Sequence, residues 1–250
     1  MAPVKNSLLP ILLFPLASAA LDPSCSPGGN FDLSTWNLQL PTGSAGSVDT
    51  IRASDLEGCD GYSGPNFYTD PSNSAIILIA PGNPSETGCA TTSGSEHCRT
   101  ELREVVASSG ANAAWSPAGT NVLSVSMTVV KADDGSHGTA IGQVFASAAS
   151  KPILEMYYSQ AGKIVVGVKP NADGNQIVTQ VGSVPLGTAF KYVLEYSNNA
   201  LSVTINGNKT ALSTYDWGSP AAYFKAGNYN QAKTDVTSEV HISALSITHS

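Results

Sequence analysis

Basic residues are scarce in this sequence, which has 12 lysines and arginines against 19 aspartates and glutamates in 250 residues. The formal net charge is −7 at pH 7 with histidine counted as neutral. Proteins that bind nucleic acids or anionic membranes draw affinity from basic patches, so this composition argues against both kinds of partner. It does not exclude an anionic substrate, because a few cations gathered in one cleft would suffice locally.

Long apolar segments are also missing, apart from one short run near the N-terminus. Residues 1–20 combine an early lysine, an apolar stretch over 8–16 and a small-residue ending. This layout is typical of a secretory signal peptide cleaved after Ala19 or Ala20, and the run is shorter than the ~20 residues that span a bilayer. We therefore predict a secreted, extracellular and monomeric protein of residues 21–250.

Only four cysteines occur, and none of them forms a Cys-x-x-Cys motif or a zinc-type spacing. An even number of cysteines in a secreted chain indicates two disulfides. Three pairings are possible, and proximity in the sequence favours Cys25–Cys59 with Cys89–Cys98.

Two loop features concern modification and metal binding. Asn208 begins an Asn-Lys-Thr sequon beside a turn, which predicts a surface N-glycosylation site. Asp133 and Asp134 could bind a structural Ca²⁺, but they belong to no EF-hand pattern. We predict no other metal and no cofactor.

The dominant pattern is the alternation of apolar and polar residues in short runs rich in β-branched and aromatic side chains. Turn sequences separate these runs, two hairpins are predicted at 153–169 and 191–206, and the only predicted helix covers 51–58. No linker or repeat divides the chain, so we predict one all-β domain, a β-jelly roll sandwich of two antiparallel sheets with a concave groove. The predicted strands cover 75–80, 99–107, 121–131, 140–147, 153–159, 163–169, 191–197, 200–206 and 238–249.

The run RTELRE places two arginines and a glutamate on one face of a predicted strand. Arg99, Glu101 and Arg103 share that face, whereas Leu102 points the opposite way. Arginine presents a planar fork that matches a carboxylate, and Glu101 can hold the fork in place. The cluster therefore predicts carboxylate recognition. The alternative is a solvated strand face with cross-strand ion pairs.

Two further runs place polar or aromatic side chains on one face of a strand. Gln143 and Phe145 share a face in GQVF, and Tyr223 shares a face with Lys225 in YFKAG. A concave, solvent-facing sheet would gather these side chains with those of RTELRE into a groove that holds a long polymer.

Together, RTELRE, GQVF and YFKAGNYNQ resemble the three signature regions of family 7 polysaccharide lyases, the alginate lyases. The run WNLQLPTG at 36–43 also looks like that family, and the resemblance extends from there to the last predicted strand. It implies a β-jelly roll, a uronate-polymer substrate and cleavage by β-elimination.

The resemblance also implies roles for particular residues. Arg99 and Gln143 match positions that bind and neutralise the uronate carboxylate, where hydrogen-bond donors lower the barrier to removal of the C5 proton. Tyr229 matches the tyrosine that protonates the leaving oxygen and can also take the C5 proton. Nearby cations would lower the pKa of Tyr229 enough for it to act as a base. The implied substrate-binding or supporting residues are Glu101, Arg103, Phe145, Tyr223, Lys225 and Gln231.

One position departs from the family pattern. The second region normally reads Gln, an aliphatic residue and His, but here it reads Gln143-Val144-Phe145. His97 is the first candidate for a replacement base. Without one, Tyr229 has to serve as both base and acid, which suits β-mannuronate or β-glucuronate, whose C5 hydrogen and C4 oxygen lie on the same side of the ring. We therefore expect weak action on α-guluronate.

Other functions fit the sequence less well. A retaining glycosidase needs two carboxylates about 5–5.5 Å apart, but arginines flank Glu101 and no Glu-x-Asp-x-x-Glu pattern occurs. A serine hydrolase would need a Gly-x-Ser-x-Gly elbow, which is also missing. A glucuronan lyase of the same fold and a non-catalytic module that binds uronate polymers remain as alternatives, the latter because of Phe145.

Overall fold

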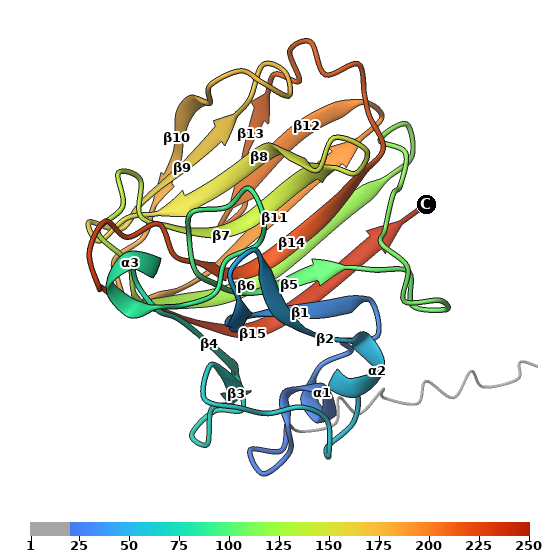
Figure 1. The fold of residues 1–250 in the computed structure, drawn as a ribbon. Coiled ribbons are helices and arrows are strands. Elements are labelled where there is room, and N and C mark those ends of the chain that lie inside the picture. Colours follow the sequence, from blue (N-terminus) through green and yellow to red (C-terminus); the bar gives the residue numbers. More distant parts are fainter. Residues whose placement is uncertain (1–20) are drawn as a thin grey trace, which may run out of the picture.

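The computed structural model describes residues 21–250, and the predicted signal peptide at 1–20 lies outside the described residues. Strands dominate this part of the chain, with three short helices (Figure 1). The helices are α1 (Pro27–Asn30), α2 (Ala53–Leu56) and α3 (Pro84–Thr87). The strands are β1 (Trp36–Ser44), β2 (Ser47–Ile51), β3 (Phe67–Thr69), β4 (Ile76–Ala80), β5 (Arg99–Glu104), β6 (Asn121–Lys131), β7 (Thr139–Ala146), β8 (Lys151–Tyr158), β9 (Lys163–Val168), β10 (Ile177–Ser183), β11 (Ala189–Ser197), β12 (Ala200–Ile205), β13 (Asn208–Leu212), β14 (Ala222–Tyr229) and β15 (Ser238–His249).

The strands form two antiparallel sheets, which confirms the predicted sandwich. The first sheet has eight strands in the order β10-β9-β8-β7-β14-β5-β1-β2, and the second has seven in the order β13-β12-β11-β6-β15-β4-β3. In the first sheet β14, from the C-terminal end of the chain, lies between β7 and β5 (Figure 1). This topology brings the three signature runs of the sequence side by side.

The hydrophobic core lies between the two sheets, because each strand sends alternate side chains inward. On β6, Leu123, Val125, Met127 and Val129 are buried, and the residues between them are half-buried. Each fully buried side chain of this size contributes about 1.5–3 kcal/mol to stability.

The centre of the first sheet does not show this alternation. β14 is buried along its whole length, and β7 is buried at every position except Phe145. Both faces of these strands are therefore covered, one by the core and the other by groups that surround the groove described below.

The predicted strands at 121–131 and 238–249 are confirmed residue for residue as β6 and β15, and both predicted hairpins form, as β8–β9 and β11–β12. The predicted strand at 99–107 ends earlier, at Glu104, because the chain turns after it with hydrogen bonds from the backbone N–H groups of 109 and 110 to the carbonyl of 106.

The helix prediction was incomplete. The helix expected over 51–58 covers only α2, and α1 and α3 were not predicted. Both of these begin with a proline, whose fixed φ suits the first helical position. At four residues each, they are too short to show a helical period in the sequence.

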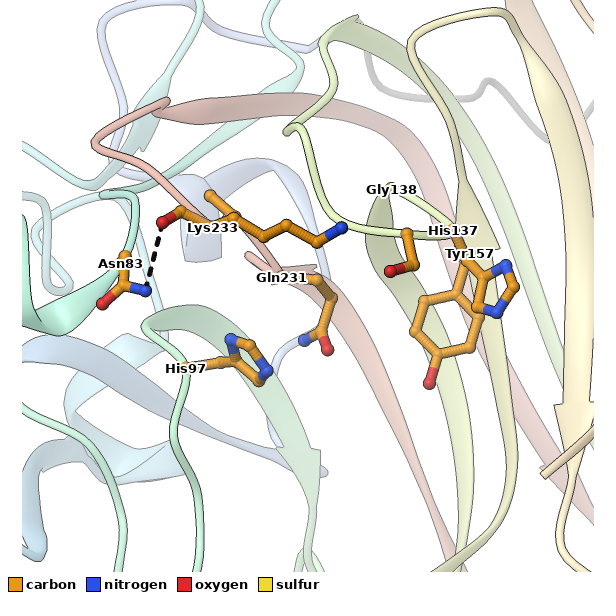
Figure 2. A pocket seen from close by; sticks show the side chains of 9 residues that line it. Asn83, His97, His137, Gly138, Tyr157, Gln231 and Lys233 are labelled. Atoms are coloured by element: carbon orange, nitrogen blue, oxygen red, sulfur yellow. Dashed lines mark hydrogen bonds between the residues drawn. The ribbon is translucent and has the colours of Figure 1, made fainter. Parts of the chain in front are cut away.

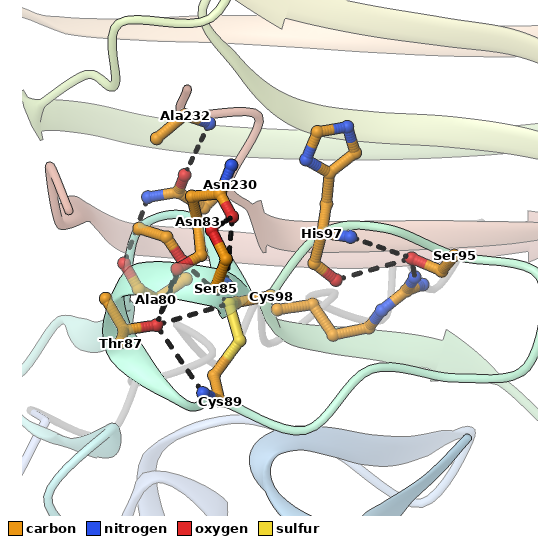
Figure 3. Close-up of a disulfide and its surroundings, with 12 residues drawn as sticks. Ala80, Asn83, Ser85, Thr87, Cys89, Ser95, His97, Cys98, Asn230 and Ala232 are labelled. Atoms are coloured by element: carbon orange, nitrogen blue, oxygen red, sulfur yellow. Dashed lines mark hydrogen bonds between the residues drawn. A yellow bond between two sulfur atoms is a disulfide. The ribbon is translucent and has the colours of Figure 1, made fainter. Parts of the chain in front are cut away.

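The structure joins Cys25 to Cys59 and Cys89 to Cys98, the pairing that sequence proximity favoured. The second disulfide closes a loop over 89–98 that leads directly into β5 (Figure 3). Within residues 21–250 no helix has the length and apolar character needed to cross a membrane.

Candidate functional site

The central strands of the first sheet place the predicted site residues opposite one another. Lys225 on β14 is opposite Gln143 on β7 and opposite Arg103 on β5, and Tyr229 is opposite Arg99. Residues directly opposite in an antiparallel pair have Cβ atoms about 4.5–5.5 Å apart. Segments far apart in the sequence thus form one continuous site.

Glu101 is the centre of a buried polar cluster on this face of the sheet. Its Oε2 atom accepts hydrogen bonds from Lys225 Nζ at 2.9 Å and from Arg99 Nη1 at 3.3 Å. Its Oε1 atom accepts one from Gln143 Nε2. We call Glu101, Arg99, Gln143 and Lys225 the Glu101 cluster.

The Glu101 cluster is enclosed, so this strand face is not solvated, although a cross-strand ion pair of the kind the alternative expected forms between Lys225 and Glu101. The exposed fractions of Arg99, Glu101, Gln143 and Lys225 are 4%, 1%, 0% and 3%. Burial lowers the pKa of Lys225 to about 8, while Glu101 acts in the opposite direction. In neutral solution two cations therefore face one carboxylate, and the excess positive charge favours an anionic ligand.

An aromatic pair lies beside the Glu101 cluster. The rings of Phe145 and Tyr223 have centroids 5.4 Å apart. Arg103 lies over the Tyr223 ring at 4.3 Å, and Lys225 Nζ lies over the Phe145 ring at 4.7 Å. Phe145 thus lines the groove, and its ring offers no proton acceptor.

The Tyr229 hydroxyl is bound by a residue that the sequence analysis missed. Its oxygen lies 2.8 Å from Ser95 Oγ, with which it shares a hydrogen bond. Ser95 Oγ also accepts from Arg99 Nη2 at 2.8 Å, and the Arg99 guanidinium lies 4.1 Å from the centre of the Tyr229 ring. Ser95 therefore links the Glu101 cluster to the phenol.

Ser95 belongs to the loop over 89–98, whose ends are joined by the Cys89–Cys98 disulfide (Figure 3). The same loop supplies Thr92, whose Oγ1 atom accepts from Arg99 Nη2 at 3.4 Å. The loop has no periodic pattern that would assign its side chains to a face. The only sequence signal was its position between a paired cysteine and the RTELRE run.

Burial raises the pKa of Tyr229, although Arg99 and Ser95 lower it. The expectation that nearby cations would lower the pKa of this phenol is therefore not met, because removal of the phenolate from water outweighs the charge of Arg99. Tyr229, with 9% of its surface exposed, holds its proton in neutral solution.

His97 lies in the 89–98 loop, because β5 begins only at Arg99. Its ring meets the Tyr229 ring edge-on, with centroids 5.8 Å apart. Burial lowers the pKa of His97, and Arg99 lowers it further, while Asp133 and Glu96 act in the opposite direction. A neutral imidazole and a neutral phenol thus lie side by side.

The polar residues of YFKAGNYNQ divide between the two faces of β14. Asn228 Nδ2 donates to the Leu78 and Ser238 carbonyls on the other sheet, so this residue serves the fold. The register with β7 shifts between Ala226 and Tyr229, an interval that contains Gly227 with φ of 141°. A Cβ there would lie 2.9 Å from the Thr100 carbonyl oxygen, so only glycine fits.

Two adjoining cavities form a groove past Tyr229. One cavity, of about 470 Å³, is lined by Arg99, Phe145 and Lys225. The other, of about 560 Å³, is lined by His97 and Gln231. Tyr229 lines both.

Glu155, which the sequence analysis did not select, also lines both cavities. It lies opposite Gln143 on β8, and its Oε2 atom accepts from Gln176 Nε2. Burial raises the pKa of Glu155, while the Tyr157 hydroxyl, Lys225 and Lys169 act in the opposite direction.

Asp133 and Asp134 bind the segment that follows β14. Asp133 accepts from the backbone N–H of Gln231 at 2.6 Å, and Asp134 accepts from that of Lys233 at 2.9 Å. Across residues 21–250 no group of three or more His, Cys, Asp or Glu residues is placed to hold a metal ion. The structural Ca²⁺ remains a prediction, as does glycosylation of Asn208, which is exposed at the start of β13.

The chain was compared with known proteins. A family model described as "Alginate lyase" matches residues 31–249. An alginate lyase of Klebsiella pneumoniae is 26% identical over an alignment of length 284, which covers 90% of this chain and 90% of that one. The structure of alginate lyase A1-II′, a member of polysaccharide lyase family 7, is 28% identical with a TM-score of 0.78 and covers 90% of this chain and 99% of that one.

Further solved structures are similar to this one. An alginate lyase from Pseudomonas aeruginosa is 27% identical with a TM-score of 0.75, over 88% of this chain and 100% of that one. Alginate lyase A1-II′ has also been solved as a tyrosine-to-phenylalanine variant with product (GGG), and as a variant with an additional histidine-to-asparagine substitution with substrate (GGMG).

Proposed function

The chain belongs to the alginate lyase family, and from that membership we propose how its groove cleaves a uronate polymer. The protein is a polysaccharide lyase that acts on alginate. We propose that residues 21–250 are the mature, secreted and monomeric enzyme domain. The two disulfides support this proposal, because such bonds persist in oxidising compartments.

The observation that carries the mechanism is the position of the Glu101 cluster beside Tyr229. Arg99 Nε is buried and has no hydrogen-bond partner among the described residues, so it can donate to a substrate carboxylate. Gln143 Nε2 donates one N–H to Glu101, and its second N–H can donate to the substrate carboxylate. These donors and the excess positive charge stabilise the enolate that forms when C5 loses its proton.

The proton transfers divide between two neighbouring side chains. His97, which is neutral because its pKa is lowered, takes the C5 proton. The electron pair of the former C5–H bond forms the C4–C5 double bond, and the C4–O4 bond breaks. Tyr229, protonated because its pKa is raised, gives its proton to the leaving O4 oxygen. Transfer of the proton from His97 to the Tyr229 phenolate then restores the starting protonation states of both residues. Opposite pKa shifts in adjacent groups favour this assignment over Tyr229 as both base and acid.

Replacing His97 with glutamine should lower kcat by about 10²-fold, the lower range for loss of a general base. In the native enzyme kcat/KM should fall on the acid side only below pH 6.5, the ordinary pKa of histidine. The reason is that the lowered pKa keeps His97 neutral to a pH below that value. The variant should lose this limb.

His241→Gln is the control, since His241 lies on β15 and binds Glu239 at 2.6 Å. Full activity of the His97 variant would mean that Tyr229, and not His97, takes the C5 proton.

The substrate preference follows from the same geometry. His97 and Tyr229 are adjacent, so they reach one side of the sugar ring, and Phe145 supplies no base from elsewhere in the groove. Polymannuronate, in which the C5 hydrogen and O4 lie on one side, should be cleaved much faster than polyguluronate. Rates of unsaturated-product formation, followed by ultraviolet absorbance, check this on both polymers and on glucuronan.

Equal rates on polymannuronate and polyguluronate would contradict the one-sided mechanism. Glucuronan cleaved faster than either would favour the glucuronan lyase alternative. Tight binding with no product on any polymer would point to the non-catalytic module, which family membership disfavours.

A further inference from the structure

We propose that the groove continues beyond the cleavage point into a second uronate-binding subsite, in which Lys233 binds the carboxylate and the His137–Tyr157 pair supports the sugar ring. The inference rests on the proposed function, because it assigns a further sugar of the same polymer to a cavity next to the reacting groups.

The cavity lies at the end of the groove nearest His97 (Figure 2). It measures about 380 Å³, within the range of roughly 300–1,000 Å³ in which small-molecule sites fall. His97 and Gln231 line both this cavity and the one that contains Tyr229. A polymer that passes Tyr229 therefore meets this cavity next.

Lys233 supplies the positive charge. None of the salt bridges found among residues 21–250 involves it, whereas Lys225 is paired with Glu101. The cavity lining contains no aspartate or glutamate. The nearby Asp133 and Asp134 carboxylates accept hydrogen bonds from the backbone of 231–233 and so hold this segment in place. The Lys233 ammonium is thus free to bind an anion.

The backbone that carries Lys233 is held from two sides. Asp134 accepts from its N–H at 2.9 Å, and Asn83 Nδ2 donates to its carbonyl at 3.4 Å (Figure 2). The backbone N–H of Asn83 also donates to the Thr234 carbonyl at 2.7 Å. A fixed backbone reduces the ordering that a ligand has to impose on binding.

An aromatic pair forms the opposite wall of the cavity. The rings of His137 and Tyr157 have centroids 5.7 Å apart, and burial raises the pKa of Tyr157 so far that it stays a neutral phenol. The Tyr157 hydroxyl donates to Gln176 Oε1 at 3.1 Å, which fixes the ring. Flat side chains present apolar area at small entropic cost, and the C–H face of a sugar ring can pack against them.

The ligand chemistry follows from these walls. A cation opposite an aromatic pair fits a group with one carboxylate and one apolar ring face. Every residue of a uronate polymer carries both, so a polymer bound at the Glu101 cluster brings the next such group into this cavity.

The test is the variant Lys233→Gln, assayed on a mannuronate hexamer and a mannuronate trimer. We expect KM for the hexamer to rise about fivefold to tenfold with kcat unchanged, since one charge-assisted hydrogen bond is lost. The trimer, which fills the cleavage point without extending through the whole groove, should show a smaller change. The matched control is Lys191→Gln, an exposed lysine on β11 of the other sheet.

A second readout separates this proposal from the proposed function. Hexamer affinity, measured by calorimetry on Tyr229→Phe protein, should fall with the added Lys233→Gln change but not with Lys191→Gln. Weaker hexamer binding without any turnover of the native enzyme would support the subsite and refute the lyase mechanism. An unchanged hexamer KM and affinity in the Lys233 variant would overturn the subsite.

Discussion

Replacing Tyr229 with phenylalanine should lower kcat by about 10²–10⁴-fold, the contribution of a positioned general acid. The variant loses only the hydroxyl that shares a hydrogen bond with Ser95 and that faces the leaving oxygen in the proposed mechanism. The ring stays in contact with Arg99 and His97, so the groove keeps its shape. Polymer affinity should therefore change little.

The measurement is kcat from the ultraviolet absorbance of the unsaturated product, together with calorimetric binding of a mannuronate hexamer. Tyr223→Phe is the matched comparison, because Tyr223 lies on the same strand and the same face but contacts Phe145 and Arg103 instead. We expect a much smaller loss in that variant. If Tyr229→Phe retained a tenth or more of the native kcat, the leaving group would need another acid.

Replacing Arg99 with glutamine should lower kcat/KM by about 10²–10³-fold, the usual effect of removing one donor that stabilises developing charge. Arg99 contacts Glu101, Ser95 and the Tyr229 ring, and its Nε has no hydrogen-bond partner among the described residues. The variant leaves Glu101 paired with Lys225, so the buried carboxylate keeps one cation and the protein should still fold.

The control for Arg99 is Arg103→Gln on the same face of β5, where the arginine lies over the Tyr223 ring at the side of the groove. That variant should raise KM with a small effect on kcat. Thermal unfolding of both variants, followed by circular dichroism, checks that the fold is intact. If both arginine variants showed the same losses, Arg99 would have no special role in the chemical step.

The accuracy of the strand predictions depended on where each strand lies in its sheet. β6 and β15 are central strands of the second sheet, and the sequence predicted their ends correctly. The strands missing from the prediction are β1, which lies inside the first sheet, and β2, β3, β10 and β13, which are the edge strands of the two sheets. An edge strand packs against fewer neighbours, so it needs less regular alternation. All seven residues of β10 are exposed or half-buried.

The same reasoning applies to the groove. Arg99, Gln143 and Tyr229 could be selected from the sequence because they lie in strands whose alternation assigns each side chain to a face. Ser95 and Lys233 lie in irregular segments, where no period links sequence position to direction. Their contacts with the groove depend on the Cys89–Cys98 disulfide and on the hydrogen bonds of Asp134.

The sequence by itself determined the all-β fold class, the three runs that meet in the first sheet and the cations that face a uronate polymer. Only the tertiary structure decided the protonation states. Position in a strand says which way Tyr229 points, but a pKa depends on the water and charges that surround a group in three dimensions. The 89–98 loop and the neighbouring strands bury Tyr229 and half-bury His97, and burial is the largest cause that raises the pKa of the phenol and lowers that of the imidazole.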